Sequence, residues 1–268
     1  MFQGDSPIAP ELLNDWIEVQ SKLKKKLVTE DDFKWKVGTK IEGGDSCQVL
    51  KYIGGVDLSL WKEDSSVACA TLVVLELKTL EIVYQDSSVV RLSVPYVPGF
   101  LAFREAPVLL ELLDKMKASS HPFYPQLLMV DGNGILHPQG FGLACHLGVL
   151  ANIPTIGIGK SLHHVDGLSK STVRERFEMD GNSSQDIIPL VGDSGQTLGA
   201  ALLSTRGSSK PIYVSIGHRI SLAVAIDIVK LSCKYRVPET IRQADIKSRQ
   251  YLQNSRLIFK GKVTGNAL

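Results

Sequence analysis

Regularly spaced apolar residues mark the first element of the chain. Between residues 8 and 29 they recur at intervals of three or four positions, which predicts an amphipathic helix. The apolar positions are Leu12, Leu13, Trp16, Ile17, Val19, Leu23 and Leu27. Four lysines lie on the polar side of this segment, at Lys22, Lys24, Lys25 and Lys26. Such a cluster is typical of a solvated helix face, although lysine clusters of this kind also contact phosphates in some proteins.

Three apolar runs follow a polar connector at residues 30–48. They cover residues 50–60, 67–77 and 82–94, and short polar turns of hairpin length separate them. Neighbouring runs joined in this way predict antiparallel strands. The first half of the chain is therefore expected to contain a meander of three strands.

The rest of the chain alternates between helical and strand-like patterns. Helices are predicted from about Phe103 and over residues 140–150, 222–234 and 239–252, with a charged helix-like run within 163–182. Strands are predicted over residues 126–130, 153–158, 187–191, 198–204 and 212–216. Pro107 is placed in the first turn of its helix, where a missing N–H is tolerated, so Glu105 falls at or just before the helix start. This order of elements predicts a single α/β domain.

Composition narrows the class of protein. The chain has 268 residues, of which 44% are hydrophobic, enough for one large domain with a substantial core. Its formal net charge of +2 permits a polyanionic partner without demanding one. Four widely spaced cysteines, Cys47, Cys69, Cys145 and Cys233, form no C-x-x-C pair and indicate neither a zinc site nor a disulfide framework.

Localisation is predicted from segments that the sequence lacks. No signal-peptide pattern opens the chain, and no apolar run is long enough to span a bilayer. We therefore expect a soluble cytoplasmic protein without membrane contact, with the nucleus or nucleolus as further compartments.

An aspartate at the end of an apolar strand is the first candidate for chemistry. Asp131 follows the run Gln126-Leu-Leu-Met-Val, and Gly132 and Gly134 come directly after it. Ligands of α/β sheets bind at the carboxyl ends of strands, and glycines let a ligand approach the backbone closely. The structural alternative is an Asx-type turn, in which Asp131 only caps local amides.

Two further carboxylates lie in the preceding segment. Asp57 follows Gly54 and Gly55 inside an apolar strand, where a carboxylate is costly to bury unless it is paired or bound to a metal. Glu105 by itself is typical of a surface glutamate that interacts favourably with a helix dipole. The pattern alone favours a functional role for Asp57 and leaves Glu105 open.

A stiff loop precedes the Glu105 helix. The string Val94-Pro-Tyr-Val-Pro-Gly-Phe contains two prolines and a glycine, and it holds Tyr96 and Phe100 outside regular structure. A rigid loop that displays an aromatic ring suits base stacking or wedging. A hydrophobic plug over the core is the alternative.

Basic residues at later strand ends are weaker candidates. Gly159-Lys160-Ser161 is not a phosphate-binding P-loop, because that motif requires glycine where Pro154 stands. Lys160 is either a phosphate contact or an ordinary exposed lysine. His218, at a strand-to-helix junction, is either a metal, water or helix-amide contact, or a packed cap. The adjacent His163 and His164 point to opposite faces of a strand and do not suggest a shared metal.

The order of the elements resembles the ribonuclease H-like fold, with a mixed central sheet of three antiparallel strands followed by parallel strands. In that fold the first strand, first helix and fourth strand each give one carboxylate to a metal site. Those places hold Asp57, Glu105 and Asp131 here. Three carboxylates at close range repel one another unless divalent cations neutralise them, and all-oxygen ligands favour Mg²⁺ or Mn²⁺. The resemblance implies two ions per site.

Five strings carry a more specific resemblance, which covers roughly residues 50–250. They are GGVDLS, PYVPGFLAFRE, VDGNGILHPQGFGLACHLGVL, PTIGIGKSL and SIGHRISL. Together they resemble endonuclease V, a nuclease family that acts at inosine, and their wording is similar to the animal branch. That branch implies a preference for inosine in single-stranded RNA over deoxyinosine in DNA.

The resemblance also implies roles for single residues. Asp57, Glu105 and Asp131 would be metal-binding carboxylates, Lys160 the active-site lysine and His218 a supporting histidine. The wedge would be Pro95, Tyr96, Val97 and Pro98, and Gly132 and Gly134 are predicted to line the base pocket. One departure is Ser161, which stands where many members have a second lysine.

These observations predict a monomeric metal-dependent endonuclease. It would cut the second phosphodiester 3′ to inosine and leave 5′-phosphate and 3′-hydroxyl ends. A deoxyinosine-specific DNA repair nuclease and a non-catalytic reader of inosine RNA are the alternatives. We expect residues 1–29 to form an N-terminal segment and helix, residues 30–253 the catalytic domain, and residues 254–268 a poorly ordered tail.

Overall fold

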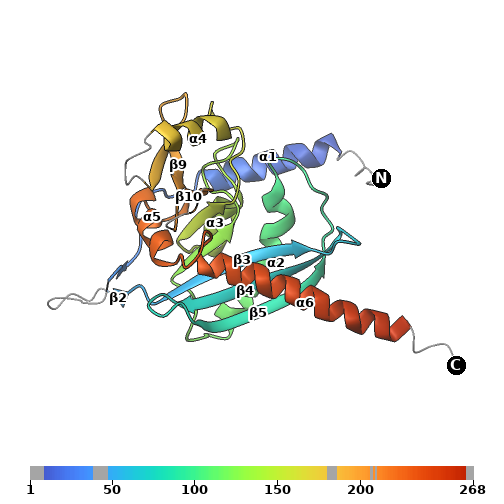
Figure 1. Cartoon of the computed structure of the whole chain (residues 1–268). Helices are drawn as coiled ribbons and strands as arrows, with labels where there is room; N and C mark the ends of the chain where they lie inside the picture. The colour runs from blue at the N-terminus through green and yellow to red at the C-terminus, as the bar shows by residue number, and fades with distance from the viewer. Residues whose placement is uncertain (1–8, 39–47, 180–185, 206–207, 209, 264–268) are drawn as a thin grey trace.

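A central mixed β-sheet organises the chain (Figure 1). The computed structural model describes residues 9–38, 48–179, 186–205, 208 and 210–263, so Cys47 lies outside the described residues. Within these residues the large sheet has eight strands in the order β5-β4-β3-β6-β7-β10-β9-β8. The strands are β3 (Tyr52–Leu60), β4 (Val67–Glu76), β5 (Ile82–Arg91), β6 (Leu127–Asp131), β7 (Thr155–Gly159), β8 (Ile187–Val191), β9 (Thr197–Leu202) and β10 (Ile212–His218).

Strand directions confirm the predicted mixed sheet and add one feature to it. Strands β3, β4 and β5 form the antiparallel meander, and β6 and β7 continue parallel to β3. The last strands, β10, β9 and β8, then pair antiparallel, which the sequence pattern did not reveal. The carboxyl ends of β3, β6 and β7 consequently meet at one edge, whereas β10 ends at the opposite edge.

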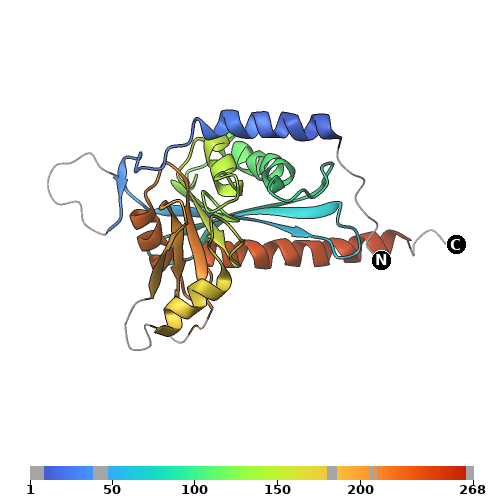
Figure 2. The same cartoon turned by 90° about the horizontal axis from the view of Figure 1, so that it is seen from above.

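Helices cover both faces of the sheet (Figure 2). The helices are α1 (Pro10–Lys24), α2 (Leu101–Ala118), α3 (Leu143–Ala151), α4 (Lys170–Met179), α5 (Leu222–Leu231) and α6 (Glu239–Val263). A two-stranded parallel sheet of β1 (Trp35–Lys36) and β2 (Gln48–Val49) lies beside them. One core packs α5 and α6 against the sheet, and a second packs α2 and α3 against the other face. This arrangement is a ribonuclease H-like α/β fold, as predicted.

Side-chain alternation along β3 decides which residues meet which core. Ile53 lies in the core under α5 and α6, and Val56 lies in the core under α2 and α3. Asp57 is four residues after Ile53, so its side chain lies on the same face of β3 and points towards α6. Gly55 allows α6 to lie directly on the strand, because a Cβ there would come within 2.5 Å of the Thr240 backbone.

Two predicted boundaries were wrong. Helix α2 begins at Leu101, so Pro107 lies in its second turn and Glu105 lies within the helix. Pro107 cannot donate a backbone hydrogen bond within the helix. Burial of the apolar face of α2 in the core stabilises the helix despite this loss. Helix α6 continues to Val263, past residue 253, where the sequence suggested the start of a tail.

In the part of the chain that the structure describes, no helix is both long enough and apolar enough to cross a bilayer.

Candidate active site

The sheet register brings Asp57 and Asp131 side by side. Val56 pairs with Val130 across the parallel strands β3 and β6, and each aspartate is the next residue on its strand. Asp131 ends β6, whereas β3 continues to Leu60 beyond it. Asp57 is only 7% exposed. The neighbouring strands β3 and β6 thus present two carboxylates at one edge of the sheet.

Helix α2 supplies the third predicted carboxylate. Burial, followed by the charges of Asp57 and Asp131, raises the pKa of Glu105 to about 8. Burial is also the main cause that raises the pKa of Asp57 to about 7, and the charge of Asp131 and a hydrogen bond with it add to this effect. Glu105 therefore senses the charges of both aspartates, and Asp57 senses that of Asp131, as expected for acidic groups gathered in a poorly solvated place.

Lys160 provides the positive charge at this cluster. It follows β7, and its Nζ lies 2.5 Å from Asp131 Oδ2. Burial disfavours the ammonium form, but the ion pair with Asp131 and the charges of Asp57 and Asp245 outweigh burial and raise the pKa of Lys160. Lys160 is accordingly protonated at neutral pH and lies against the carboxylate that sequence analysis singled out first.

Helix α6 adds Ser248 and Asp245 to the cluster, and Ser59 of β3 joins them; sequence analysis missed all three. Ser248 Oγ donates a hydrogen bond to Asp57 Oδ2 at 3.0 Å, and Ser59 Oγ donates to the same oxygen at 3.2 Å. Asp245, one turn earlier on α6, interacts with the charge of Lys160 and pairs with Arg249 at 2.8 Å. In the sequence Asp245 and Arg249 look like an ordinary surface pair at i,i+4 spacing. No local signal distinguishes such a pair from one placed at an active site.

The donor chemistry of the cluster fits a hard divalent cation. Its carboxylates supply only oxygen atoms, and burial together with the neighbouring carboxylates raises the pKa values of Asp57 and Glu105, an effect that a divalent cation would offset. Among the described residues, however, no three His, Cys, Asp or Glu side chains form a group arranged to hold a metal ion. Lys160 is instead the cation in contact with Asp131. The cluster has suitable ligands but is not a preformed three-ligand site.

The predicted wedge is a loop displayed between β5 and α2. Tyr96 is 55% exposed, Pro98 is exposed, and Pro95 and Val97 are half-buried. Phe100 anchors the loop, because its ring packs 6.0 Å from that of Trp16 on α1. The tyrosine ring is therefore held on a fixed support and left open to solvent.

The two glycines that were predicted to line the base pocket use their backbone N–H groups inside the fold, and their role in the pocket stays a prediction. The N–H of Gly134 donates to Ser215 Oγ at 2.8 Å, and the N–H of Gly132 donates to the Ile158 carbonyl at 3.1 Å. A Cβ on Gly134 would collide with the Ile216 carbonyl oxygen. Both backbone donors are thus used inside the fold, and Gly134 is needed because the loop packs directly on β10.

His218 lies away from this carboxylate cluster, and its catalytic role stays a prediction from the sequence. It pairs with Thr155 at the start of β7, whereas Tyr213, at the other end of β10, pairs with Gly159 beside Lys160. The side chain is 4% exposed, and its Nδ1 accepts a hydrogen bond from the Val28 N–H at 3.3 Å. Burial lowers the pKa of His218 to about 4. The residue is a neutral, packed histidine at the opposite edge of the sheet.

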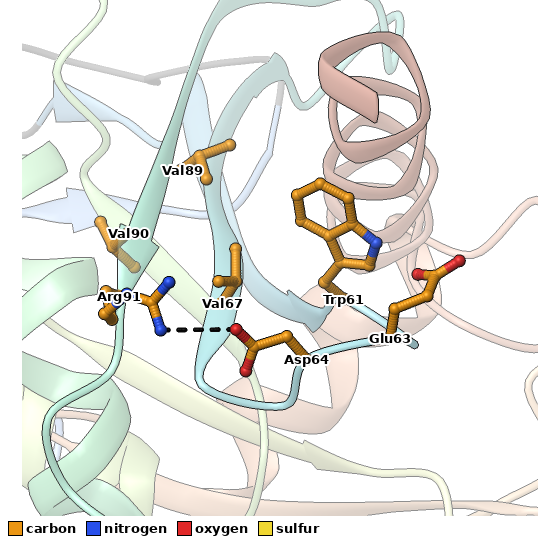
Figure 3. Close-up of a pocket in the computed structure, with 7 residues that line it drawn as sticks. All are labelled: Trp61, Glu63, Asp64, Val67, Val89, Val90 and Arg91. Carbon is orange, nitrogen blue, oxygen red and sulfur yellow. Dashed lines mark hydrogen bonds and ion pairs between the residues drawn. The ribbon is translucent and has the colours of Figure 1, made fainter. Parts of the chain in front are cut away.

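A separate cavity of about 430 Å³ lies at the turn between β3 and β4 (Figure 3). Trp61 and Val67 line it, and Arg91 crosses it to pair with Asp64 at 3.4 Å. The complete lining is Trp61, Glu63, Asp64, Val67, Val89, Val90 and Arg91. Because Asp64 already pairs with Arg91 and the carboxylates of the cluster lie elsewhere, this cavity is distinct from the active-site candidate.

The fold and the site together define an α/β protein of the ribonuclease H-like class, with a carboxylate cluster at the carboxyl ends of its central strands. A family model described as Endonuclease V matches residues 31–246. Mouse Endonuclease V is 46% identical over 245 residues, which cover 91% of this chain and 71% of the mouse protein. Human Endonuclease V is 45% identical over 245 residues, covering 91% of this chain and 85% of the human protein. The chain belongs to the Endonuclease V family.

Solved structures of relatives agree with this assignment. The crystal structure of the catalytic domain of human Endonuclease V matches with a TM-score of 0.85 and 43% identity, covering 92% of this chain and 98% of that one. Endonuclease V of Ciona intestinalis, crystallised with a 24mer DNA that contains an inosine followed by a ribo-adenosine, matches with a TM-score of 0.81. Its identity is 35%, with 91% of this chain and 99% of that chain covered.

Proposed function

We propose that the protein is a metal-dependent endonuclease that cuts single-stranded RNA at inosine. The observation that carries this proposal is the meeting of Asp57, Glu105, Asp131 and Lys160 at one edge of the sheet. Family membership supports an endonuclease, and the inosine in the Ciona complex supports the choice of base. The ribo-adenosine after that inosine supports a contact with a ribose 2′-hydroxyl.

A divalent cation, Mg²⁺ or Mn²⁺, is the cofactor that we propose for this cluster. Asp57, Asp131 and Glu105 would hold it, with two ions per site as the full complement. When bound, such ions lower the pKa of a water molecule and neutralise charge that develops on the phosphate and leaving oxygen.

The protein groups of the cluster have distinct tasks in this proposal. The hydrogen bonds from Ser248 and Ser59 both reach Oδ2 of Asp57 and hold this carboxylate in a fixed orientation. Lys160 is protonated and exposed enough to reach a phosphate, so it can offset negative charge in the transition state. Cleavage would fall at the second phosphodiester 3′ to inosine and leave 5′-phosphate and 3′-hydroxyl ends.

Recognition of the base would begin at the exposed wedge. Removing a base from its stack costs a few kcal/mol, and an aromatic ring that stacks in its place returns about 1–3 kcal/mol. Tyr96 is the ring that the wedge loop displays to solvent. We therefore propose that Tyr96 fills the gap left when the inosine leaves the stack.

A DNA repair activity is the second candidate function, because the Ciona relative was crystallised with inosine-containing DNA. The convergence of all three carboxylates argues against the third candidate, a non-catalytic reader of inosine RNA. A reader would have no need for a buried acidic cluster that destabilises its own ionised form.

One assay separates these candidates. Matched RNA and DNA strands that contain one inosine, or none, are incubated with Mg²⁺, with Mn²⁺ or with EDTA, and Asp57→Ala serves as the control. We expect discrete cleavage of inosine RNA with either metal, weaker cleavage of the DNA, and no cleavage by the variant despite residual binding. Preferential cutting of DNA would establish the repair function, and binding without cleavage would establish the reader. Near-normal turnover by Asp57→Ala would overturn the site assignment.

A further inference from the structure

A basic cavity beside the cluster has no role in the catalytic proposal. It measures about 550 Å³ and lies between α4, β10 and the segment that leads into β10. We call it the α4 cavity. Its lining residues are Lys170, Val173, Arg174, Phe177, Leu203, Lys210, Pro211 and Tyr213.

The charge and chemistry of the α4 cavity point to one kind of ligand. Lys170, Arg174 and Lys210 are exposed, and no carboxylate occurs among the described residues that line it. Two aromatic rings, the half-buried Phe177 and the buried Tyr213, contribute to the same lining. Positive groups beside aromatic rings are the combination with which proteins bind single-stranded nucleic acid, through phosphate contacts and base stacking.

The α4 cavity is structurally continuous with the catalytic edge. Tyr213 pairs with Gly159, the residue before Lys160. The Arg236 guanidinium donates hydrogen bonds to the carbonyl oxygens of Lys160 at 2.8 Å, Pro211 at 2.8 Å and Lys210 at 3.0 Å. One side chain therefore joins the backbone that carries the active-site lysine to the backbone that forms the cavity.

We propose that the α4 cavity binds the part of the nucleic-acid strand that flanks the cleaved bond. This inference rests on the proposed nuclease function and extends its substrate site beyond the inosine and the scissile phosphate. Lys170 and Lys210 contact phosphates, and Phe177 offers an apolar ring to a flanking base. The cavity lengthens the bound segment of the strand without contributing to the chemistry.

Two double variants test the proposal by charge. Lys170→Gln with Lys210→Gln removes both lysines of the α4 cavity. Lys78→Gln with Lys117→Gln is the matched control, because Lys78 follows β4 and Lys117 lies in the last turn of α2, both at the opposite edge of the sheet. Each variant is measured with a long inosine RNA that has extended single-stranded flanks and with a short one that has minimal flanks. Binding is measured in the Asp57→Ala background over a range of salt concentrations, and cleavage in the active enzyme.

The expected result is a length-dependent defect. For the cavity variant, affinity for the long RNA falls about tenfold. The slope of log Kd against log salt concentration falls by about 0.7 for each phosphate contact removed. The ratio of kcat/KM for the long RNA to kcat/KM for the short RNA also falls. The control leaves both RNAs unchanged. Equal losses for both RNAs, or no loss for either, would overturn the proposal, and thermal melting of each variant verifies its fold. Absence of cleavage by the unaltered protein would refute the nuclease function alone, because the binding arms still test the cavity.

A second variant tests the aromatic contribution. Phe177→Leu keeps an apolar side chain at the edge of the α4 cavity and removes the ring. We expect it to weaken binding of the long RNA several-fold and to have little effect when the flanking nucleotides are abasic. The same loss on the abasic RNA would show that the ring only packs and would contradict the stacking contact.

Discussion

The electrostatic environment of single carboxylates is the residue-scale feature that distinguishes this site. Burial and mutual repulsion raise the pKa values of Asp57 to about 7 and Glu105 to about 8. Ion-paired surface carboxylates in the same chain behave oppositely, because hydrogen bonds from Ser66 lower the pKa of Asp64. A divalent cation bound beside these carboxylates would favour their ionised forms.

The exposed ring of Tyr96 leads to the first residue-scale prediction. Tyr96→Ala should weaken binding to inosine RNA about tenfold or more and weaken binding to the unmodified strand much less, because only base extrusion creates a gap to fill. Fluorescence anisotropy with matched RNAs measures both affinities. The same loss on the two strands would mean that the ring only packs.

His218 gives a prediction that separates structure from catalysis. His218→Ala removes the acceptor of the Val28 N–H and leaves that donor unpaired, so the free energy of unfolding should fall by about 1–3 kcal/mol. Cleavage of inosine RNA well below the melting temperature should stay within about threefold of the unaltered protein. A hundredfold loss of kcat in a folded His218→Ala protein would support the catalytic role predicted from the sequence.

At the scale of elements, α6 completes a site that β3 and β6 begin. Thr240 of α6 rests on Gly55, and Ser248, farther along the helix, reaches Asp57. The close approach at Gly55 thus fixes the height of the helix above the strand. The distance from Ser248 to the carboxylate depends on it.

Gly55→Ala tests this dependence. The new Cβ would lie 2.5 Å from the Thr240 backbone, so α6 must move away from β3. We expect a loss of about 1–3 kcal/mol in stability together with a fall in kcat of at least tenfold. Chemical denaturation and single-turnover cleavage measure the two effects.

Gly54→Ala is the matched control on the opposite face of β3. Its Cβ would meet the end of the flexible Leu128 side chain at 2.8 Å, rather than backbone. We expect a smaller loss of stability and nearly unchanged kcat. Equal effects on kcat would show that the position of α6 does not control the site.

At the scale of the whole molecule, the two hydrophobic cores hold the acidic cluster together at a cost in stability. For Asp57 and Glu105 the folded-state pKa values of about 7 and about 8 lie above the ordinary values of 3.8 and 4.5. The folded protein therefore favours the protonated forms of these two groups. The stability that they contribute is fully present below about pH 4 and is lost as the pH rises through 7 and 8. A bound divalent cation favours the ionised carboxylates and should offset this loss.

Thermal melting with and without Mg²⁺ tests this linkage. The increase in Tm caused by Mg²⁺ should be larger at pH 8.5 than at pH 6, with each kcal/mol worth about 2–4 °C in a chain of this size. Asp57→Asn combined with Glu105→Gln should abolish the difference, because neither side chain can ionise. An increase in Tm that is independent of pH would place the metal away from these carboxylates.

The sequence by itself determined the type and order of most elements, and it singled out Asp57 and Asp131 as candidates for chemistry. Apolar periodicity is local, so it predicted the β3-β4-β5 meander, the strand that ends at Asp131 and the helix that contains Glu105. The resemblance to the ribonuclease H-like fold then related Asp57, Glu105 and Asp131 before any contact between them was known. Element boundaries were less certain, because the packing of α2 allows Pro107 to lie inside the helix.

Tertiary structure decided what depends on direction and close approach. The antiparallel course of β10 carries His218 to the edge opposite Lys160, and strand direction cannot be read from an apolar run. Packing of α6 on Gly55 brings Ser248 to Asp57, although those residues lie 191 positions apart. The close packing of the Gly134 backbone against β10 also follows only from the folded chain, because it joins segments that are far apart in the sequence. Local patterns specify which residues can do chemistry, and long-range pairing specifies which of them meet.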